Sequence, residues 1–97
     1  KYLIFSGIGN PDSFKKTLIK NKIKIVKEII FADHYNYTLK DIENIKLLAK
    51  NLNAKILTTE KDYLRINNKI SSGIDFLQIE LIIKNENNLI KFIKSHL

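Results

Sequence analysis

Three short polar segments interrupt a sequence that is otherwise rich in lysine and isoleucine. They are Gly-Ile-Gly-Asn-Pro at 7–11, Phe-Ala-Asp-His-Tyr at 31–35 and Thr-Thr-Glu-Lys-Asp at 58–62. Each segment follows an apolar run of the kind that forms a buried strand. Because the carboxyl ends of parallel strands lie along one edge of a sheet, where ligands bind, we expect the three segments to meet at such an edge.

The first segment has the composition of a tight turn that leads into a helix. Gly7 and Gly9 allow the turn, and the helix that begins after Asn10 presents unpaired N–H groups to an anion. The same glycines are also explained by a strand-to-helix turn that needs them for backbone reasons alone. Asp12 stands where a dinucleotide-binding fingerprint has its third glycine, and no G-x-x-x-x-G-K-[ST] phosphate loop occurs in the chain. Gly7, Gly9 and Asn10 are therefore candidate substrate-binding residues without a nucleotide signature.

The second segment contains the pair Asp33 and His34, which makes it the candidate catalytic segment. A histidine beside a carboxylate at the end of a strand can act as a base or polarise another group. The alternative is a loop pair that caps the helix expected to begin near Thr38. The other histidine, His96, lies next to the C-terminus and is expected to be solvated.

The third segment carries hydroxyl and ammonium groups at the expected start of a helix. Thr59 can cap that helix or hold a phosphate, and Lys61 can neutralise the phosphate charge. The alternative is an ordinary charged first turn, in which Glu60 and Asp62 lie where the helix dipole favours acidic side chains. Thr59 and Lys61 are candidate substrate-binding residues.

Composition excludes several classes of function. The chain has no cysteine, so zinc–thiolate sites and cysteine nucleophiles are excluded, and without H-E-x-x-H or paired histidine spacing we expect no metal ligands. The formal net charge is +7, but Arg65 is the only arginine among 17 basic residues. Lysine, isoleucine and asparagine share AT-rich codons, which suffices to explain this charge. Nucleic-acid sites usually add arginine and stacked aromatic residues, so no nucleic-acid partner is expected.

The elements that must position these residues alternate along the chain. The pattern predicts strands at 2–6, 23–31, 55–58 and 75–83. It predicts helices from Pro11 to about Asn21, from a Thr38–Asp41 capping box to about Leu52, from Thr59 through Ile66, and over 85–97. This order favours one three-layer α/β domain over 1–97, a Rossmann-like lobe with a mainly parallel four-stranded sheet and helices on both faces. The direction of the fourth strand stays open.

Taken together, three motifs resemble the C-terminal half of the tetraacyldisaccharide 4'-kinase (lipid A 4'-kinase) family. They are G-I-G-N-P-x-x-F at 7–14, F-x-D-H-Y-x-Y at 31–37 and T-T-E-K-D-x-x-R at 58–65, each followed by an amphipathic helix. The resemblance implies an enzyme that transfers the ATP γ-phosphoryl group to the 4'-hydroxyl of a lipid A disaccharide precursor. It also implies work at the cytoplasmic face of the inner membrane of Gram-negative bacteria, in peripheral contact with anionic lipid.

The resemblance also implies that two lobes supply different parts of the active site. In the family, an N-terminal P-loop lobe binds ATP and Mg²⁺ and supplies an aspartate as catalytic base. By motif match, His34 is the histidine that pairs with that aspartate, while Asp33, Lys61 and the Gly7–Asn10 turn shape the cleft. Since the chain has no methionine and opens directly on an apolar run, we expect a fragment of a longer protein. Alone it is expected to lack kinase activity.

Two other classes of function compete with a kinase lobe. One is a small α/β ligand-binding module, such as a receiver-like domain, but a receiver has an acidic pair where this chain has Phe5-Ser6-Gly7. The other is a basic domain that docks on anionic lipid or nucleic acid, for which binding would collapse steeply with salt.

Overall fold

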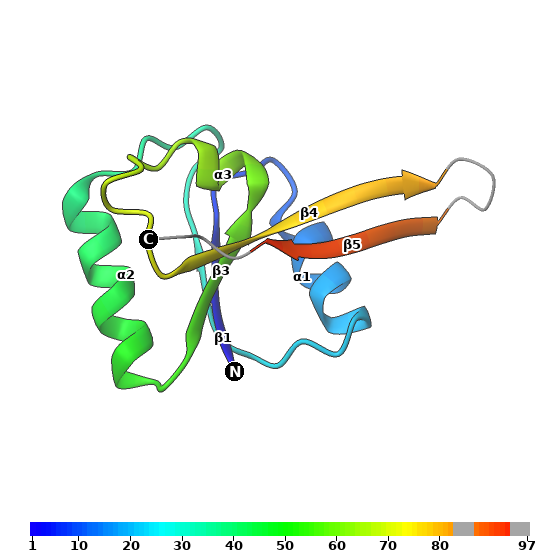
Figure 1. Ribbon diagram of the computed structural model, residues 1–97, viewed down its shortest axis with the longest axis horizontal. Helices are drawn as coiled ribbons and strands as arrows, with labels where there is room; N and C mark the ends of the chain where they lie inside the picture. The colour runs from blue at the N-terminus through cyan, green and yellow to red at the C-terminus, as the bar shows by residue number, and fades with distance from the viewer. Residues whose placement is uncertain (83–86, 94–97) are drawn as a thin grey trace.

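The protein forms one five-stranded sheet with helices packed against it (Figure 1). The computed structural model describes the backbone of residues 1–82 and 87–93 and the side chains of residues 1–77. The elements are β1 (Tyr2–Ser6), α1 (Pro11–Lys20), β2 (Ile25–Ile30), α2 (Leu39–Asn51), β3 (Lys55–Thr59), α3 (Glu60–Leu64), β4 (Ile74–Ile82) and β5 (Asn87–Ile93).

The sheet has the strand order β2-β1-β3-β4-β5. Neighbouring strands from β2 to β4 run parallel, which confirms the expected parallel sheet and settles the direction of the fourth strand. β4 pairs with β3 through Ile74–Leu77, and its pairing with β5 is antiparallel and extends to Ile82. The carboxyl ends of β1, β2 and β3 therefore lie along one edge of the sheet, where the three polar segments are expected to meet.

The terminal helix expected over 85–97 is wrong, because residues 87–93 form the strand β5. The sheet consequently has five strands instead of four. Leu89, Ile90 and Ile93 fit a helical stripe, but a short run rich in isoleucine and phenylalanine suits a strand equally well by periodicity. Pairing decides the outcome, since β4 would otherwise present an unpaired edge. Residues 83–86 and 94–97, with His96, lie outside the described residues.

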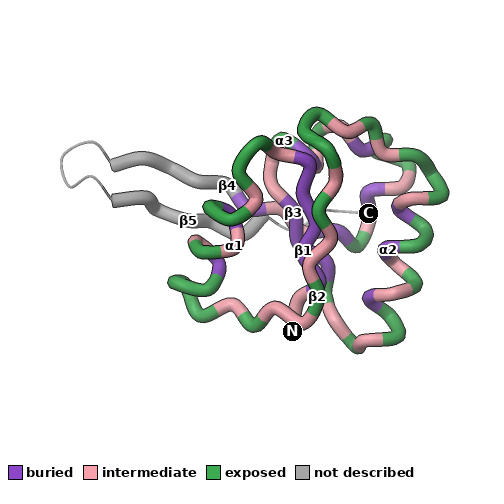
Figure 2. The backbone as a smooth tube through the Cα atoms, turned by 180° about the vertical axis from the view of Figure 1, so that it is seen from behind, coloured by how far each residue is buried: buried purple, intermediate pink, exposed green. Residues whose placement is uncertain are grey.

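Alternation along the strands divides the core into two layers. Leu3 and Phe5 of β1 face α2 and pack with Ile42 and Ile45, whereas Ile4 between them belongs to the cluster on the opposite face, with Phe14 and Leu18 of α1. Figure 2 shows the buried positions concentrated in β1 and β3, between the two helices. The expected three-layer α/β fold is confirmed.

Capping residues fix where each helix begins. The Asn10 side chain accepts a hydrogen bond from the backbone N–H of Ser13, and Pro11 occupies the first turn of α1. Thr38 and Asp41 form the expected capping box of α2. The first turns of α1 and α3 thus follow closely on the ends of β1 and β3.

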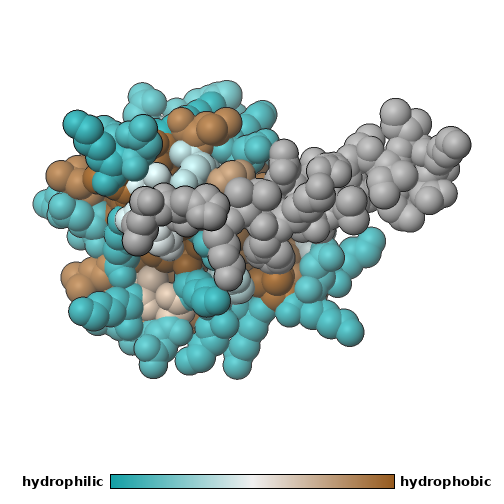
Figure 3. All heavy atoms as spheres, viewed as in Figure 1, coloured by the Kyte–Doolittle hydropathy of each residue, from teal (hydrophilic) through white to brown (hydrophobic). Residues whose placement is uncertain are grey.

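Among the residues coloured in Figure 3, hydrophilic ones form most of the periphery of this face. Within the described residues, no helix has both the length and the apolar character that a membrane span requires.

Candidate functional site

The carboxylate of Asp62 joins the three motifs at 7–14, 31–37 and 58–65 beside the carboxyl edge of the sheet. Asp62 is fully buried, and its Oδ1 accepts hydrogen bonds from the Gly7 N–H at 3.0 Å and the Tyr37 hydroxyl at 2.9 Å. Its Oδ2 accepts a third from the Thr59 hydroxyl at 2.6 Å. Gly7 follows β1 directly, Tyr37 lies in the loop between β2 and α2, and Thr59 ends β3, so one side chain connects the segments that follow or end three strands.

Tyr37 is the centre of an aromatic cluster beneath the second segment. Its ring lies 5.3 Å from that of Phe5, 5.1 Å from Phe31 and 5.2 Å from Tyr35, all near edge-to-face. Burial, reinforced by the nearby Asp62 carboxylate, raises the pKa of Tyr37 far above its usual range. The hydroxyl therefore stays protonated and continues to donate to Asp62. The aromatic residues of the F-x-D-H-Y-x-Y motif thus have a structural role.

Gly7 is required by close packing. A Cβ at this position would lie 2.8 Å from the backbone oxygen of Ala32 and 3.2 Å from both Tyr35 Cβ and the Tyr37 hydroxyl. The fold therefore needs glycine at this position for steric reasons. Its N–H donates to Asp62 and is not left unpaired for an anion. Gly9 differs, since it is exposed and the nearest atom to an added Cβ is Asp33 Oδ2 at 3.5 Å.

Asn10 and Thr59 are brought together, although both already act as caps. They line a cavity of about 230 Å³ between the first segment and the end of β3, with Ile8, Ser13, Phe14 and Thr17 as the other walls. Asn10 accepts from Ser13, while Thr59 accepts from the Asp62 N–H and donates to the Asp62 carboxylate. Lys61 is exposed on α3 and does not line this cavity.

Asp33 and His34 project from the loop after β2. The side chain of Asp33 is 52% exposed and that of His34 is 70% exposed, with 3.8 Å between Asp33 Oδ2 and His34 Nε2. His34 has φ of 61°, in the left-handed region, and its N–H donates to the Gly7 carbonyl at 3.0 Å. Its ring Nδ1 contacts Nη2 of Arg65. The segment is not the helix cap considered as an alternative, because Thr38 and Asp41 cap α2.

Sequence reasoning missed two residues of this arrangement. The helix dipole accounts for Asp62 locally, whereas its partners Gly7 and Tyr37 lie 55 and 25 residues away, beyond the reach of any local sequence pattern. Arg65 is the single arginine of the sequence, and no local pattern assigns it a role. Its isolation among lysines was a usable signal, because a planar guanidinium is needed only where a lysine cannot make the same contacts.

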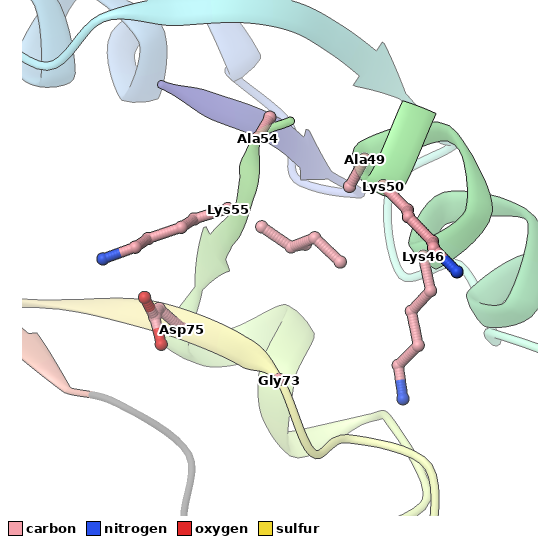
Figure 4. A pocket seen from close by; sticks show the side chains of 8 residues that line it. Lys46, Ala49, Lys50, Ala54, Lys55, Gly73 and Asp75 are labelled. Carbon is pink, nitrogen blue, oxygen red and sulfur yellow. The ribbon is translucent and has the colours of Figure 1, made fainter. Parts of the chain in front are cut away.

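A larger hollow lies at the other end of the strands (Figure 4). It has a volume of about 430 Å³ and is lined by Lys46, Ala49, Lys50, Ala54, Lys55, Ile56, Gly73 and Asp75. It contains none of the candidate residues, because it lies where β3 and β4 begin. Among residues 1–77, whose side chains are described, no group of three or more histidine, aspartate or glutamate side chains could hold a metal ion.

Comparisons with known proteins agree on one family. The family model described as tetraacyldisaccharide-1-P 4'-kinase matches residues 1–97. The tetraacyldisaccharide 4'-kinase of Pelagibacter ubique (strain HTCC1062) is 48% identical over 88 residues, covering 91% of this chain and 28% of that protein. That of Rickettsia bellii (strain OSU 85-389) is 49% identical over 88 residues, covering 91% and 27%. That of Rickettsia felis (strain ATCC VR-1525 / URRWXCal2) is 45% identical over 84 residues, covering 87% and 26%.

The chain thus spans little more than a quarter of the length of these curated relatives. No solved structure matches it. The family model, however, covers every strand end that contributes to the Asp62 arrangement. By this match along its whole length, the chain belongs to the tetraacyldisaccharide-1-P 4'-kinase family.

Proposed function

We propose that this chain is the C-terminal lobe of a kinase that phosphorylates the 4'-hydroxyl of a lipid A disaccharide precursor. The observation that carries the proposal is the family match over residues 1–97, together with relatives that bear the name tetraacyldisaccharide 4'-kinase. The meeting of three motif segments at one sheet edge supports it. Neither a ligand-binding module nor a lipid- or nucleic-acid-docking domain is favoured by these comparisons.

In the proposed reaction, His34 acts from the exposed loop after β2. Its imidazole orients a carboxylate of the P-loop lobe, and that carboxylate accepts the proton of the 4'-hydroxyl. The hydroxyl oxygen then forms a bond to the γ-phosphorus of ATP while the bond from that phosphorus to the β-phosphate bridging oxygen breaks and ADP leaves. Positioning and charge neutralisation supply most of the acceleration in such transfers. The exposure of His34 supports this role, because a partner group can reach its ring.

ATP and Mg²⁺ are proposed to bind mainly to residues outside these 97. The chain has no phosphate-loop motif, and residues 1–77 offer no cluster of metal-ligating side chains. When bound, Mg²⁺ neutralises phosphate charge. We propose that Asp33, Gly9 and Lys61, all exposed near the edge, face the substrate, with Asn10 and Thr59 shaping the adjacent cavity. On this view, the isolated chain is inactive.

The proposed location is the cytoplasmic face of the bacterial inner membrane, where the lipid substrate is presented. A formal charge of +7 supports peripheral contact with anionic lipid, since each lysine near such a surface contributes about 1 kcal/mol of attraction.

The test is the variant His34→Ala in the longer protein that carries this chain. We expect kcat to fall by about a hundredfold or more, with KM and the circular dichroism spectrum little changed. Leu64→Ala is the control, because Leu64 is 75% exposed on neighbouring α3 and should leave kcat unchanged. An unchanged kcat in His34→Ala would remove this histidine from the mechanism. ATP turnover by the isolated chain would contradict the proposal that ATP and Mg²⁺ bind mainly to residues outside these 97.

A further inference from the structure

Four hydrogen bonds form a closed circuit through Gly7, His34, Asp62 and Arg65. Its members include one residue from each of the three polar segments. Asp62 Oδ1 accepts from the Gly7 N–H at 3.0 Å, and the Gly7 carbonyl accepts from the His34 N–H at 3.0 Å. Nδ1 of His34 contacts Nη2 of Arg65, whose own backbone N–H donates to the Asp62 carbonyl at 3.0 Å. The circuit returns to its starting residue, so the backbone and the ring of His34 are both tied to the same short helix.

The Arg65 contact determines which nitrogen of His34 carries the proton. A guanidinium has only N–H donors, so Nδ1 must accept the hydrogen bond and cannot itself be protonated in this contact. The neutral ring then carries its proton on Nε2, on the opposite side from Arg65. The distance of 3.8 Å from Nε2 to Asp33 Oδ2 is too long for a hydrogen bond. In the described arrangement, the Nε2 proton therefore points away from the residues that hold the ring.

Stability alone is a weak explanation for this contact. The contact is exposed to solvent, where a polar pair adds little to the free energy of unfolding. The anchor of Arg65, by contrast, is deeply buried: Asp62 is three residues earlier, has no solvent exposure and makes three side-chain hydrogen bonds as acceptor. A fully buried anchor that carries a half-buried arginine is the arrangement expected when the position of an exposed ring matters.

We propose that Arg65, anchored through Asp62, is the positioning residue that holds His34 as its Nε2–H tautomer. With Nδ1 held by Arg65, the ring presents Nε2–H to a carboxylate that approaches from outside this chain. The inference deepens the proposed function, and it rests on that function only for the claim that His34 takes part in phosphoryl transfer. In this proposal Asp62 and Arg65, the D-x-x-R of the third motif, position a histidine and do not hold a phosphate.

The structural half of the proposal is tested by the ¹⁵N spectrum of the His34 ring. In the longer protein at alkaline pH, with histidine labelled and the His34 signals assigned by their loss in His34→Gln, Nδ1 should resonate as a hydrogen-bonded acceptor. Arg65→Ala should move that resonance toward the value of a solvated ring, and Arg65→Lys should restore it only in part. Leu64→Ala should leave it in place. An unmoved resonance in Arg65→Ala overturns the inference and leaves the proposed function untouched.

The catalytic half is tested by a double-mutant cycle. We expect Arg65→Ala to lower kcat about tenfold with KM for the disaccharide little changed, which is the pattern of a lost transition-state contribution. If Arg65 acts through His34, then Arg65→Ala combined with His34→Ala should be no slower than His34→Ala alone. Additive losses would assign Arg65 a separate role and overturn the inference. If His34→Ala itself keeps full kcat while the ¹⁵N shift is seen, the proposed function has failed and the positioning contact stands.

Discussion

Two aspartates of the candidate site, Asp33 and Asp62, have the same side chain and opposite environments. The Asp33 side chain is 52% exposed, and its Oδ2 lies 3.8 Å from Nε2 of His34. Asp62 is fully buried, and its carboxylate accepts hydrogen bonds from Gly7 after β1, Tyr37 in the loop after β2, and Thr59 at the end of β3. The sequence drew attention to Asp33, because it precedes a histidine. The structure gives the organising role to Asp62, which the sequence presented as an ordinary residue of a first helical turn.

The comparison shows that a residue next to His34 in the sequence need not be the one that holds His34 in the fold. Asp33 is next to His34 in the chain but has no contact that fixes the ring. Asp62 lies 28 residues further along than His34 and controls its backbone through Gly7. Each of the following experiments changes one side of this comparison.

The largest effect is expected from Asp62→Ala. This variant leaves the Gly7 N–H and the hydroxyls of Tyr37 and Thr59 without their acceptor in a buried site, where each lost partner costs about 1–3 kcal/mol. The free energy of unfolding in urea should fall by about 3 kcal/mol or more. Asp33→Ala should change it by less than about 0.5 kcal/mol. Equal losses in the two variants would remove the distinction between these aspartates.

A second contrast involves Gly7 and Gly9, which lie near Asp62 and Asp33 respectively. Gly7→Ala places a Cβ 2.8 Å from a backbone oxygen, and we expect a loss of about 2 kcal/mol. Gly9→Ala meets only Asp33 Oδ2 at 3.5 Å and should be neutral or slightly stabilising. Thermal unfolding of both variants measures the difference. A tolerated alanine at position 7 would show that the contact between the first and second segments is loose.

A smaller effect should follow from Tyr37→Phe, which removes one of the three donors to Asp62. Hydrogen bonds to charged groups contribute about 1.5–3 kcal/mol, and the ring packing against Phe5 and Phe31 is retained. We expect a loss near 1.5 kcal/mol by urea unfolding. The same change combined with Asp62→Ala should cost little more than Asp62→Ala alone, because the partner is already missing. Independent losses would indicate that Tyr37 acts mainly through its ring.

The smallest effect concerns Asp41, a third aspartate that lies between the two extremes of burial. The backbone N–H of Thr38, with the Tyr35 hydroxyl, holds the pKa of Asp41 below its usual range. Its contribution to stability should therefore be complete above the unfolded pKa of about 3.9, and it should disappear as the pH falls through the lowered folded value. Asp41→Ala should cost about 1 kcal/mol at pH 7. The difference from the unchanged protein should shrink in acid, and a growing difference would contradict the assignment.

Much of the fold was predictable because its determinants are local. The alternation of Leu3, Ile4 and Phe5 sets which side chains face each helix, and Asn10 and Thr38 mark helix starts. The Asp62 circuit was not predictable, because its hydrogen bonds join residues that only the folded sheet brings together. The strand β5 was not predictable for a related reason, since pairing with β4 decides between two periodicities that the sequence allows equally.

The left-handed backbone of His34 has a consequence for how this position can vary. A residue with a side chain gives up about 1 kcal/mol or more in that conformation, and glycine does not. His34→Gly should therefore fold at least as firmly as the unchanged protein while losing the imidazole. A screen for thermal stability alone would select against this histidine, and only a selection that requires the activity of the whole protein would keep it.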